Sequence, residues 1–119
     1  MVEAKSDGIE QFGLKPEALE LIREAFRRHP EVREVRIFGS RAMGRFENHS
    51  DVDLALWGDL DPAMIARIMG ELDELPLPYA FDVQAYESIS HELLKRHIDE
   101  FGSVLYSATF HQDLDPRAT

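Results

Sequence analysis

The chain has 119 residues, 44% of them apolar, and carries a net charge of −10 from 23 acidic and 13 basic residues. This length fits one domain with a real core, and the acidic charge argues against direct binding of nucleic acid, whose binders usually present a basic face. The chain lacks cysteine and any apolar run of about 18 residues. We therefore expect no disulfide, no signal peptide, no membrane span and a cytoplasmic protein.

The first half of the chain predicts an arm, a helix and two strands. Residues 1–13 are polar without periodicity, which is typical of a flexible N-terminal arm. A helix is expected to start near Pro16, a favoured first-turn residue, and it carries an apolar stripe at helical spacing. β-Branched and aromatic residues predict strands over 32–38 and 52–56. Between them, residues 40–44 can form a short helical turn.

The second half predicts a helix, a strand, a helix and a last strand. Asp61 is suited to cap the first of these helices and Pro62 to open it. The second helix is expected to be capped by Ser88 or Ser90. The expected ranges are 62–72, 79–85, 88–101 and 104–106, followed by a polar C-terminal tail over 107–119.

The order of these elements predicts an α/β fold of the α+β kind. The link between strands 32–38 and 52–56 is short and mostly loop, which allows antiparallel pairing. A small mixed β-sheet with helices packed against it is therefore favoured over a doubly wound parallel sheet. We expect one domain over residues 14–106.

Three aspartates on the expected strands indicate a metal site. Asp51 and Asp53 are two residues apart, so their carboxylates point the same way and repel each other unless a cation lies between them. Carboxylate oxygens suit Mg²⁺. Asp82 joins the pair if its strand is the neighbour, and three carboxylates can hold two metals for in-line attack at phosphorus. Taken alone, Asp51 is explained as a turn residue and Asp82 as a solvent-facing strand residue.

A Gly-Ser pair at the end of the first strand suggests a phosphate site. Gly39 lets the backbone approach a ligand closely, and Ser40 would start a short turn whose N–H groups and hydroxyl bind phosphate. Arg41 and Arg45 are available for phosphate charge, and Gly44 keeps the loop open. A lone Gly-Ser is usually a plain turn. Its place before the Asp-x-Asp strand favours a nucleoside triphosphate site.

Four aromatic residues have roles that the sequence leaves open. Trp57 follows the Asp-x-Asp strand and either packs at its end or provides a platform for adenine. Tyr86, Tyr106 and Phe110 lie in the C-terminal part and would form a partner surface if they are exposed.

The segment GSRAMG over 39–44, followed by SDVDL over 50–54, resembles the nucleotidyltransferase superfamily of DNA polymerase β. More narrowly, it is similar to the minimal nucleotidyltransferases, called MNT proteins, over most of the chain. The resemblance implies one or two Mg²⁺ ions and ATP as co-substrate. The site residues it implies are Asp51, Asp53 and Asp82 as metal ligands and catalytic groups, and Gly39, Ser40, Arg41 and Gly44 as nucleotide-binding residues.

The same resemblance implies transfer of a nucleoside monophosphate, AMP from ATP, to a hydroxyl. Many MNT proteins are antitoxins of a helical HEPN-type ribonuclease toxin, to whose tyrosine they attach AMP. The chain has no room for an acceptor-binding domain, so we expect this partner to supply the acceptor. Two alternatives stay open. One is a non-catalytic antitoxin or regulator that acts by contact, and the other, disfavoured by the missing substrate domain, is an aminoglycoside-type small-molecule nucleotidyltransferase.

Overall fold

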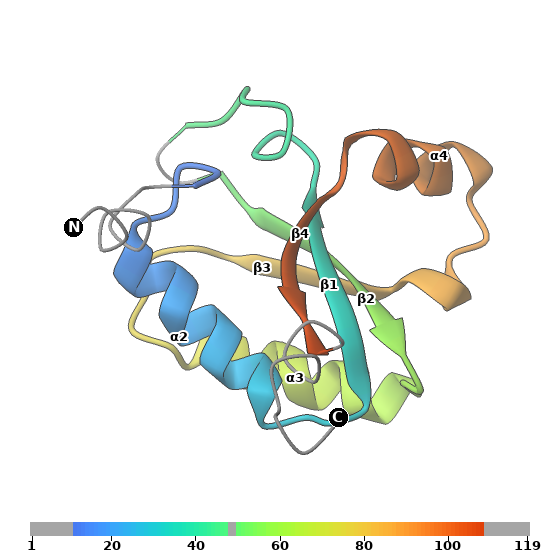
Figure 1. Ribbon diagram of the computed structural model, residues 1–119, viewed down its shortest axis with the longest axis horizontal. Helices are drawn as coiled ribbons and strands as arrows, with labels where there is room; N and C mark the ends of the chain where they lie inside the picture. The colour runs from blue at the N-terminus through green and yellow to red at the C-terminus, as the bar shows by residue number, and fades with distance from the viewer. Residues whose placement is uncertain (1–10, 48–49, 109–119) are drawn as a thin grey trace, which may run out of the picture.

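A four-stranded sheet with helices on both faces forms the protein (Figure 1). The computed structural model describes residues 11–47 and 50–108. This mixed sheet with packed helices confirms the predicted fold class. The strands are β1 (Val32–Phe38), β2 (Val52–Gly58), β3 (Phe81–Ala85) and β4 (Ser103–Ser107). The helices are α2 (Pro16–Arg27), α3 (Pro62–Asp73), α4 (Glu92–Phe101) and a short 3₁₀ turn, η1 (Tyr86–Ser88).

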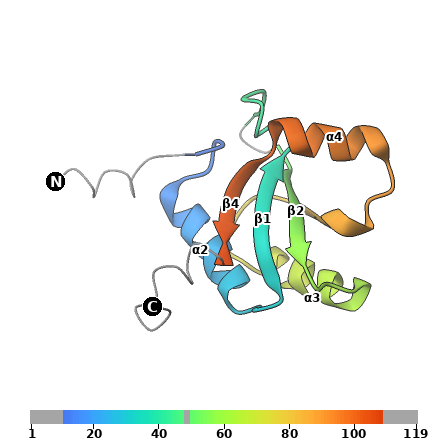
Figure 2. The same ribbon diagram turned by 45° about the vertical axis from the view of Figure 1, so that its right-hand side comes forward.

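The strand order in the sheet is β3-β2-β1-β4. β1 runs antiparallel to both β2 and β4, whereas β2 and β3 are parallel because α3 carries the chain back between them. The loop between β1 and β2 stands at the same end of the sheet as the C-terminal end of α4 (Figure 2). This topology brings the starts of β2 and β3 to the end of the sheet at which β1 finishes.

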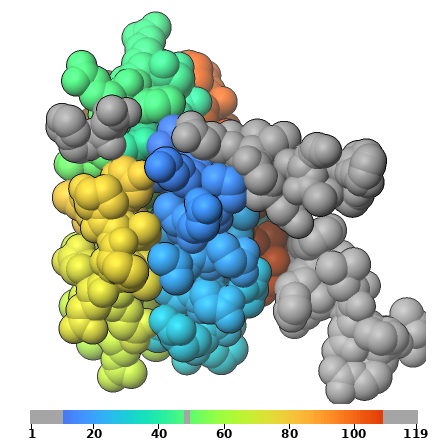
Figure 3. All heavy atoms as spheres, turned by 90° about the vertical axis from the view of Figure 1, so that its left-hand side faces the viewer, coloured from blue at the N-terminus to red at the C-terminus, as the bar shows by residue number. Residues whose placement is uncertain are grey.

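The main core lies between the sheet and the pair α2 and α3, which pack side by side (Figure 3). Period-two alternation sends every second strand side chain into this layer. Burial of each large apolar side chain contributes about 1.5–3 kcal/mol. Fully buried members from the strands and the two helices are Val35, Ile37, Leu54, Leu56, Ile22, Phe26, Ile68 and Leu72.

α4 covers the opposite face of the sheet, where Ile98 packs against Phe38 and Ala55. Trp57 belongs to this layer: its ring stacks on Tyr86 with centroids 4.4 Å apart, and the Arg36 guanidinium lies 4.9 Å from its centroid. This is the packing alternative for Trp57, not the adenine platform.

The two tyrosines that the structure describes do not meet the condition for an aromatic partner surface, which was full exposure. Tyr86 stacks on Trp57, and Tyr106 stacks on Phe26 at 6.0 Å, so both rings are partly buried. Phe110 lies outside the described residues. Large apolar side chains are instead exposed at Leu93, Phe101 and Val104, by 66%, 44% and 53%.

Most helix starts match those predicted from the sequence, with one clear exception. Pro16 and Pro62 open their helices, and Asp61 caps α3 by accepting the Met64 N–H at 2.9 Å. The last helix begins at Glu92, not near residue 88, because η1 first turns the chain. Its cap is His91, whose Nδ1 accepts the Leu94 N–H at 3.3 Å; the predicted serine caps are wrong.

The two expected terminal segments are only partly described. Residues 11–13 of the arm pack against the domain: Gln11 and Leu14 exchange backbone hydrogen bonds, and Leu14 is fully buried. Residues 1–10 and 109–119 lie outside the described residues. Within the described ranges, no helix combines the length and apolar character that crossing a membrane requires.

Candidate functional site

Three aspartates come together where β2 and β3 begin. The parallel pairing sets Asp53 directly opposite Asp82, and Asp51 immediately precedes β2. Val52 and Leu54 are buried in the main core, so the alternation of the strand turns Asp53 to the other face. The sequence made the grouping of Asp82 with the pair conditional on neighbouring strands, and that condition is met.

Asp53 is the most perturbed of these carboxyl groups. Burial, followed by the negative charges of Asp82 and Asp51, raises its pKa to about 6, although the positive charge of Arg41 acts in the opposite direction. Burial and neighbouring negative charges disfavour the charged carboxylate, whereas a nearby positive charge favours it. The site therefore holds more negative charge than its own residues neutralise, which is the condition that favours a bound cation.

The chemistry of these donors suits magnesium. Three carboxylates at one end of two strands supply the hard oxygen ligands that this ion prefers, and it commonly takes one or two carboxylates with the rest from water and phosphate. No three His, Cys, Asp or Glu side chains in residues 11–47 and 50–108 already stand in position to hold a metal ion. A closed cage is not needed where substrate phosphates complete the coordination.

Gly39 is in close contact with the Asp53 carboxylate. Its φ is +77°, a conformation that favours glycine, and a Cβ added there would lie 2.3 Å from Oδ2 of Asp53. The cause is the β1–β2 register, which pairs Phe38 with Asp53 and so carries the next residue past that carboxylate. Backbone conformation and close approach thus both require glycine at this position.

The residues after Gly39 form a hydrogen-bonded turn. The Met43 N–H donates to the carbonyls of Gly39 and Ser40, each at 3.2 Å, and the Arg45 N–H donates to the Ser40 carbonyl at 2.9 Å. The first backbone N–H groups of a helical turn have no hydrogen-bond acceptor within that turn, and the donors in this one are Met43, Gly44 and Arg45. Ser40 is half-buried beside the aspartates, so the expected phosphate cradle and the carboxylates lie at the same end of the sheet.

Arg41 is placed differently from the expected phosphate contact. Only 2% of it is exposed, and its guanidinium donates to the Ser50 carbonyl at 2.9 and 3.1 Å and to the Phe12 carbonyl at 2.8 Å. The rings of Phe46 and Tyr79 lie 5.3 and 5.0 Å from it. Arg41 therefore ties the arm and the loop to the residue that precedes Asp51, while its charge remains close enough to act on Asp53.

His97 is a site residue that the sequence did not reveal. Its Nε2 accepts the Gly39 N–H at 3.1 Å, across 58 positions of the chain. The spacing along α4 gives no hint of this, because the contact depends on how α4 lies across the end of β1. Gly44 has a φ of +75°, but a Cβ added there would have no atom within 4 Å, so this glycine serves the turn without touching the aspartates.

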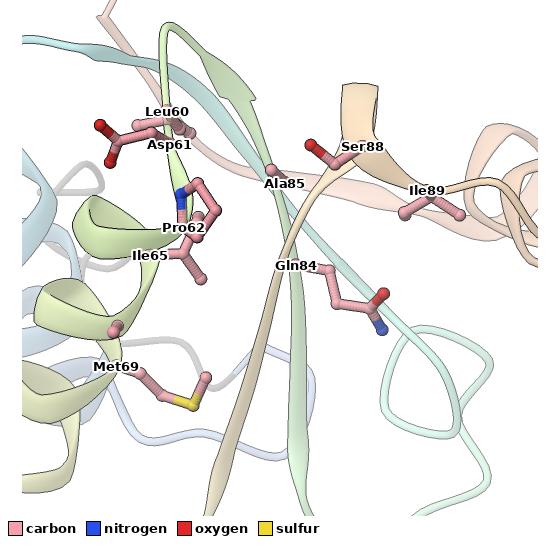
Figure 4. A pocket seen from close by; sticks show the side chains of 10 residues that line it. Leu60, Asp61, Pro62, Ile65, Met69, Gln84, Ala85, Ser88 and Ile89 are labelled. Atoms are coloured by element: carbon pink, nitrogen blue, oxygen red, sulfur yellow. The ribbon is translucent and has the colours of Figure 1, made fainter.

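An apolar cavity of about 350 Å³ lies elsewhere, between α3 and β3 (Figure 4). Ile65 and Met69 line it from α3, and Gln84 and Ala85 line it from the carboxyl end of β3. The aspartates lie at the opposite end of β2 and β3. This cavity includes no predicted site residue and is separate from the carboxylate cluster.

The sequence profile of the family described as "Polymerase beta, Nucleotidyltransferase" matches residues 20–111, which is well over half of the chain. That span contains the turn after β1 and all three aspartates. No curated protein matches the chain.

Several solved structures share the fold. One chain comes from a toxin–antitoxin complex with AMP-PNP (TM-score 0.65, 22% identity, 81% of this chain and 78% of that chain). Another comes from the toxin–antitoxin MntA–HepT (TM-score 0.61, 19% identity, 84% and 79%). A third comes from the tri-AMPylated Shewanella oneidensis HEPN toxin in complex with MNT antitoxin (TM-score 0.60, 20% identity, 82% and 76%). At these identities the likeness is one of fold.

Asp53→Asn should change how stability depends on pH. The folded pKa of about 6 lies above the ordinary 3.8, so the folded chain binds more protons between these values and its free energy of unfolding falls as pH rises through them. Without divalent cations, the variant should gain about 1–2 kcal/mol at about pH 7.5 and less at about pH 5. Urea unfolding at the two pH values measures both free energies. Asp59→Asn, an exposed aspartate beyond the other end of β2, should show no such pH dependence.

Gly39→Ala should disrupt the site, whereas Gly44→Ala should cost only backbone strain. Both positions have positive φ, a penalty of about 1 kcal/mol for alanine, but only at Gly39 does the new methyl meet Asp53. Thermal unfolding and Mg²⁺-dependent binding of ATP should separate the two effects. Equal losses of binding in both variants would contradict the close contact at Gly39.

Arg41→Lys should destabilise the chain by about 2–4 kcal/mol, because a single ammonium group lacks the spread of donors with which the guanidinium reaches both carbonyls, and it would be left buried with poorer hydrogen bonds. Arg45→Lys, an exposed change in the same loop, should fall within about 0.5 kcal/mol of wild type. Urea unfolding compares the two. A small loss in the free energy of unfolding for Arg41→Lys would contradict the structural role, and the predicted role in phosphate binding would then be the better explanation of Arg41.

Proposed function

The chain belongs to the polymerase β-type nucleotidyltransferase family, and on that basis we propose that it transfers a nucleoside monophosphate, AMP from ATP, to a hydroxyl of a protein partner. One observation carries the proposal. Three carboxylates and a glycine-serine turn, from separate parts of the chain, meet at one end of the sheet. Phosphate binding and metal binding both belong to that chemistry.

In this proposal the turn binds phosphate and the aspartates bind the metal. Amides of the turn that begins at Ser40 receive the triphosphate, and its hydroxyl adds a further donor. Asp51 and Asp53, with Asp82, would hold Mg²⁺, which when bound would offset the charge of the phosphates and polarise them. Close contact between Gly39 and Asp53 keeps the phosphate turn and the carboxylates at a fixed separation.

The transfer step needs a proton acceptor, and we assign that role to Asp82. Its side chain is exposed and it lies on the edge strand β3, so an approaching hydroxyl can reach it. The hydroxyl oxygen forms a bond to the α-phosphorus while the bond from that phosphorus to the bridging oxygen of the β-phosphate breaks. Pyrophosphate leaves, and Asp82 takes the hydroxyl proton.

A helical HEPN-type toxin is the acceptor that we propose, with this chain as its antitoxin. The solved structures of the same fold come from toxin–antitoxin complexes, one with AMP-PNP and one with an AMPylated HEPN toxin. In the described part of the chain, no second domain offers a platform for an acceptor. Exposed Leu93, Phe101 and Val104 are apolar surface of the kind that partners cover.

Intact mass spectrometry of the partner that copurifies with the chain tests this function. After incubation with Mg²⁺ and ATP, the partner should gain one or more AMP units, and fragmentation should place them on a hydroxyl residue. Asp53→Asn and Asp82→Asn should each reduce the rate by at least about 100-fold. Asp59→Asn is the matched control and should transfer AMP at the wild-type rate.

The outcomes separate chemistry from contact. In one outcome, the partner forms a tight complex with the chain yet gains no mass with any of the four nucleoside triphosphates. If the double variant Asp51→Ala, Asp53→Ala also still neutralises the partner, the chain is an antitoxin that acts by contact and not an enzyme. Transfer that survives Asp82→Asn would remove that residue from the mechanism.

A further inference from the structure

One hydrogen bond links α4 to the phosphate turn. The Nε2 atom of His97 accepts the backbone N–H of Gly39 at 3.1 Å. Because that nitrogen accepts, it carries no proton, and a neutral ring holds its proton on Nδ1. An imidazole thus binds the backbone of the residue that touches Asp53.

The His97 ring is itself held in place. It lies edge-on to Phe38 at 6.1 Å between centroids and beside Phe101 at 5.3 Å. One residue further along α4, Ile98 is fully buried against the sheet and fixes the helix there. The acceptor nitrogen is therefore presented from a rigid element, with little freedom left in the side chain.

Gly39 needs such an anchor more than most residues would. A glycine has no side chain to restrict its φ and ψ, yet this one must hold φ at +77° against the Asp53 carboxylate. Its carbonyl already accepts the Met43 N–H of the turn. The bond to His97 fixes the amide on the other side, so both polar groups of this residue have partners.

We propose that His97 is a positioning residue for the nucleotide: through the Gly39 N–H it sets the phosphate turn at its working distance from the aspartates. This proposal rests on the proposed function. It gives α4 a task besides covering the sheet, because a shift of that helix would loosen the turn. Since Gly39 donates to His97, the phosphates are left to Ser40 and the amides after it.

Three variants test this role. His97→Phe keeps a ring between Phe38 and Phe101 but has no acceptor, whereas His97→Gln offers a carbonyl oxygen at a similar reach. His91→Phe is the matched control, since His91 lies on the same helix and also accepts a backbone N–H, that of Leu94, away from the site. His91→Phe weakens the start of α4 without touching Gly39.

Two measurements are made on each variant of the full chain. Amide hydrogen exchange by NMR reports on the Gly39 N–H without any nucleotide, and titration calorimetry with Mg²⁺ and ATP gives the dissociation constant. In His97→Phe we expect loss of Gly39 protection and about tenfold weaker ATP binding, the effect of one hydrogen bond. His97→Gln should stay within about threefold of wild type, and His91→Phe should bind ATP as wild type does.

Each outcome has a distinct meaning. If wild type binds ATP and His97→Phe binds it equally well, His97 is not a positioning residue and the proposal is overturned, although the proposed function stands. Equal weakening by His97→Phe and His91→Phe also overturns it, because general loss of α4 would then explain the effect. If wild type does not bind ATP while Gly39 remains protected, the proposed function fails and this proposal falls with it.

Discussion

Mutual repulsion among three carboxylates is the constraint on which the rest of the site depends. Asp53 is half-buried, opposite Asp82 and two residues from Asp51, and its pKa of about 6 reflects that burial and those charges. A structure serving stability alone would not group acids in this way. The surrounding residues hold the carboxylates in place and leave much of their charge uncompensated.

Residues from separate elements share the task of holding this arrangement. Gly39, at the end of β1, allows the backbone to pass against Asp53, and Arg41 binds the carbonyl of the residue before Asp51. His97 reaches the same glycine from α4. The positive charge of Arg41 also lowers the pKa of Asp53, so it moderates the repulsion among the carboxylates. The negative site therefore remains suited to a cation and its phosphate ligands.

Position in the sheet gives Asp53 and Asp82 different surroundings. Parallel pairing with β2 puts the Asp82 carboxyl on the edge strand, where it is exposed, while Asp53 in β2 is shielded. In the proposed transfer, the acceptor hydroxyl approaches from the exposed side of Asp82, and the nucleotide lies on the side of Asp53. The apolar cavity at the other end of β3 takes no part in this arrangement.

The sequence by itself determined the local features, such as the helix starts at Pro16 and Pro62, and the order of the elements favoured a mixed sheet. The local features follow from short-range rules of capping, periodicity and backbone freedom. The acids and the Gly-Ser pair were also recognised as candidates from the sequence. Tertiary structure alone decided that Arg41 is buried under the loop, that Trp57 stacks on Tyr86, and that His97 binds Gly39. The physical reason is that such contacts join residues far apart in the chain, and their partners are fixed only when the layers pack.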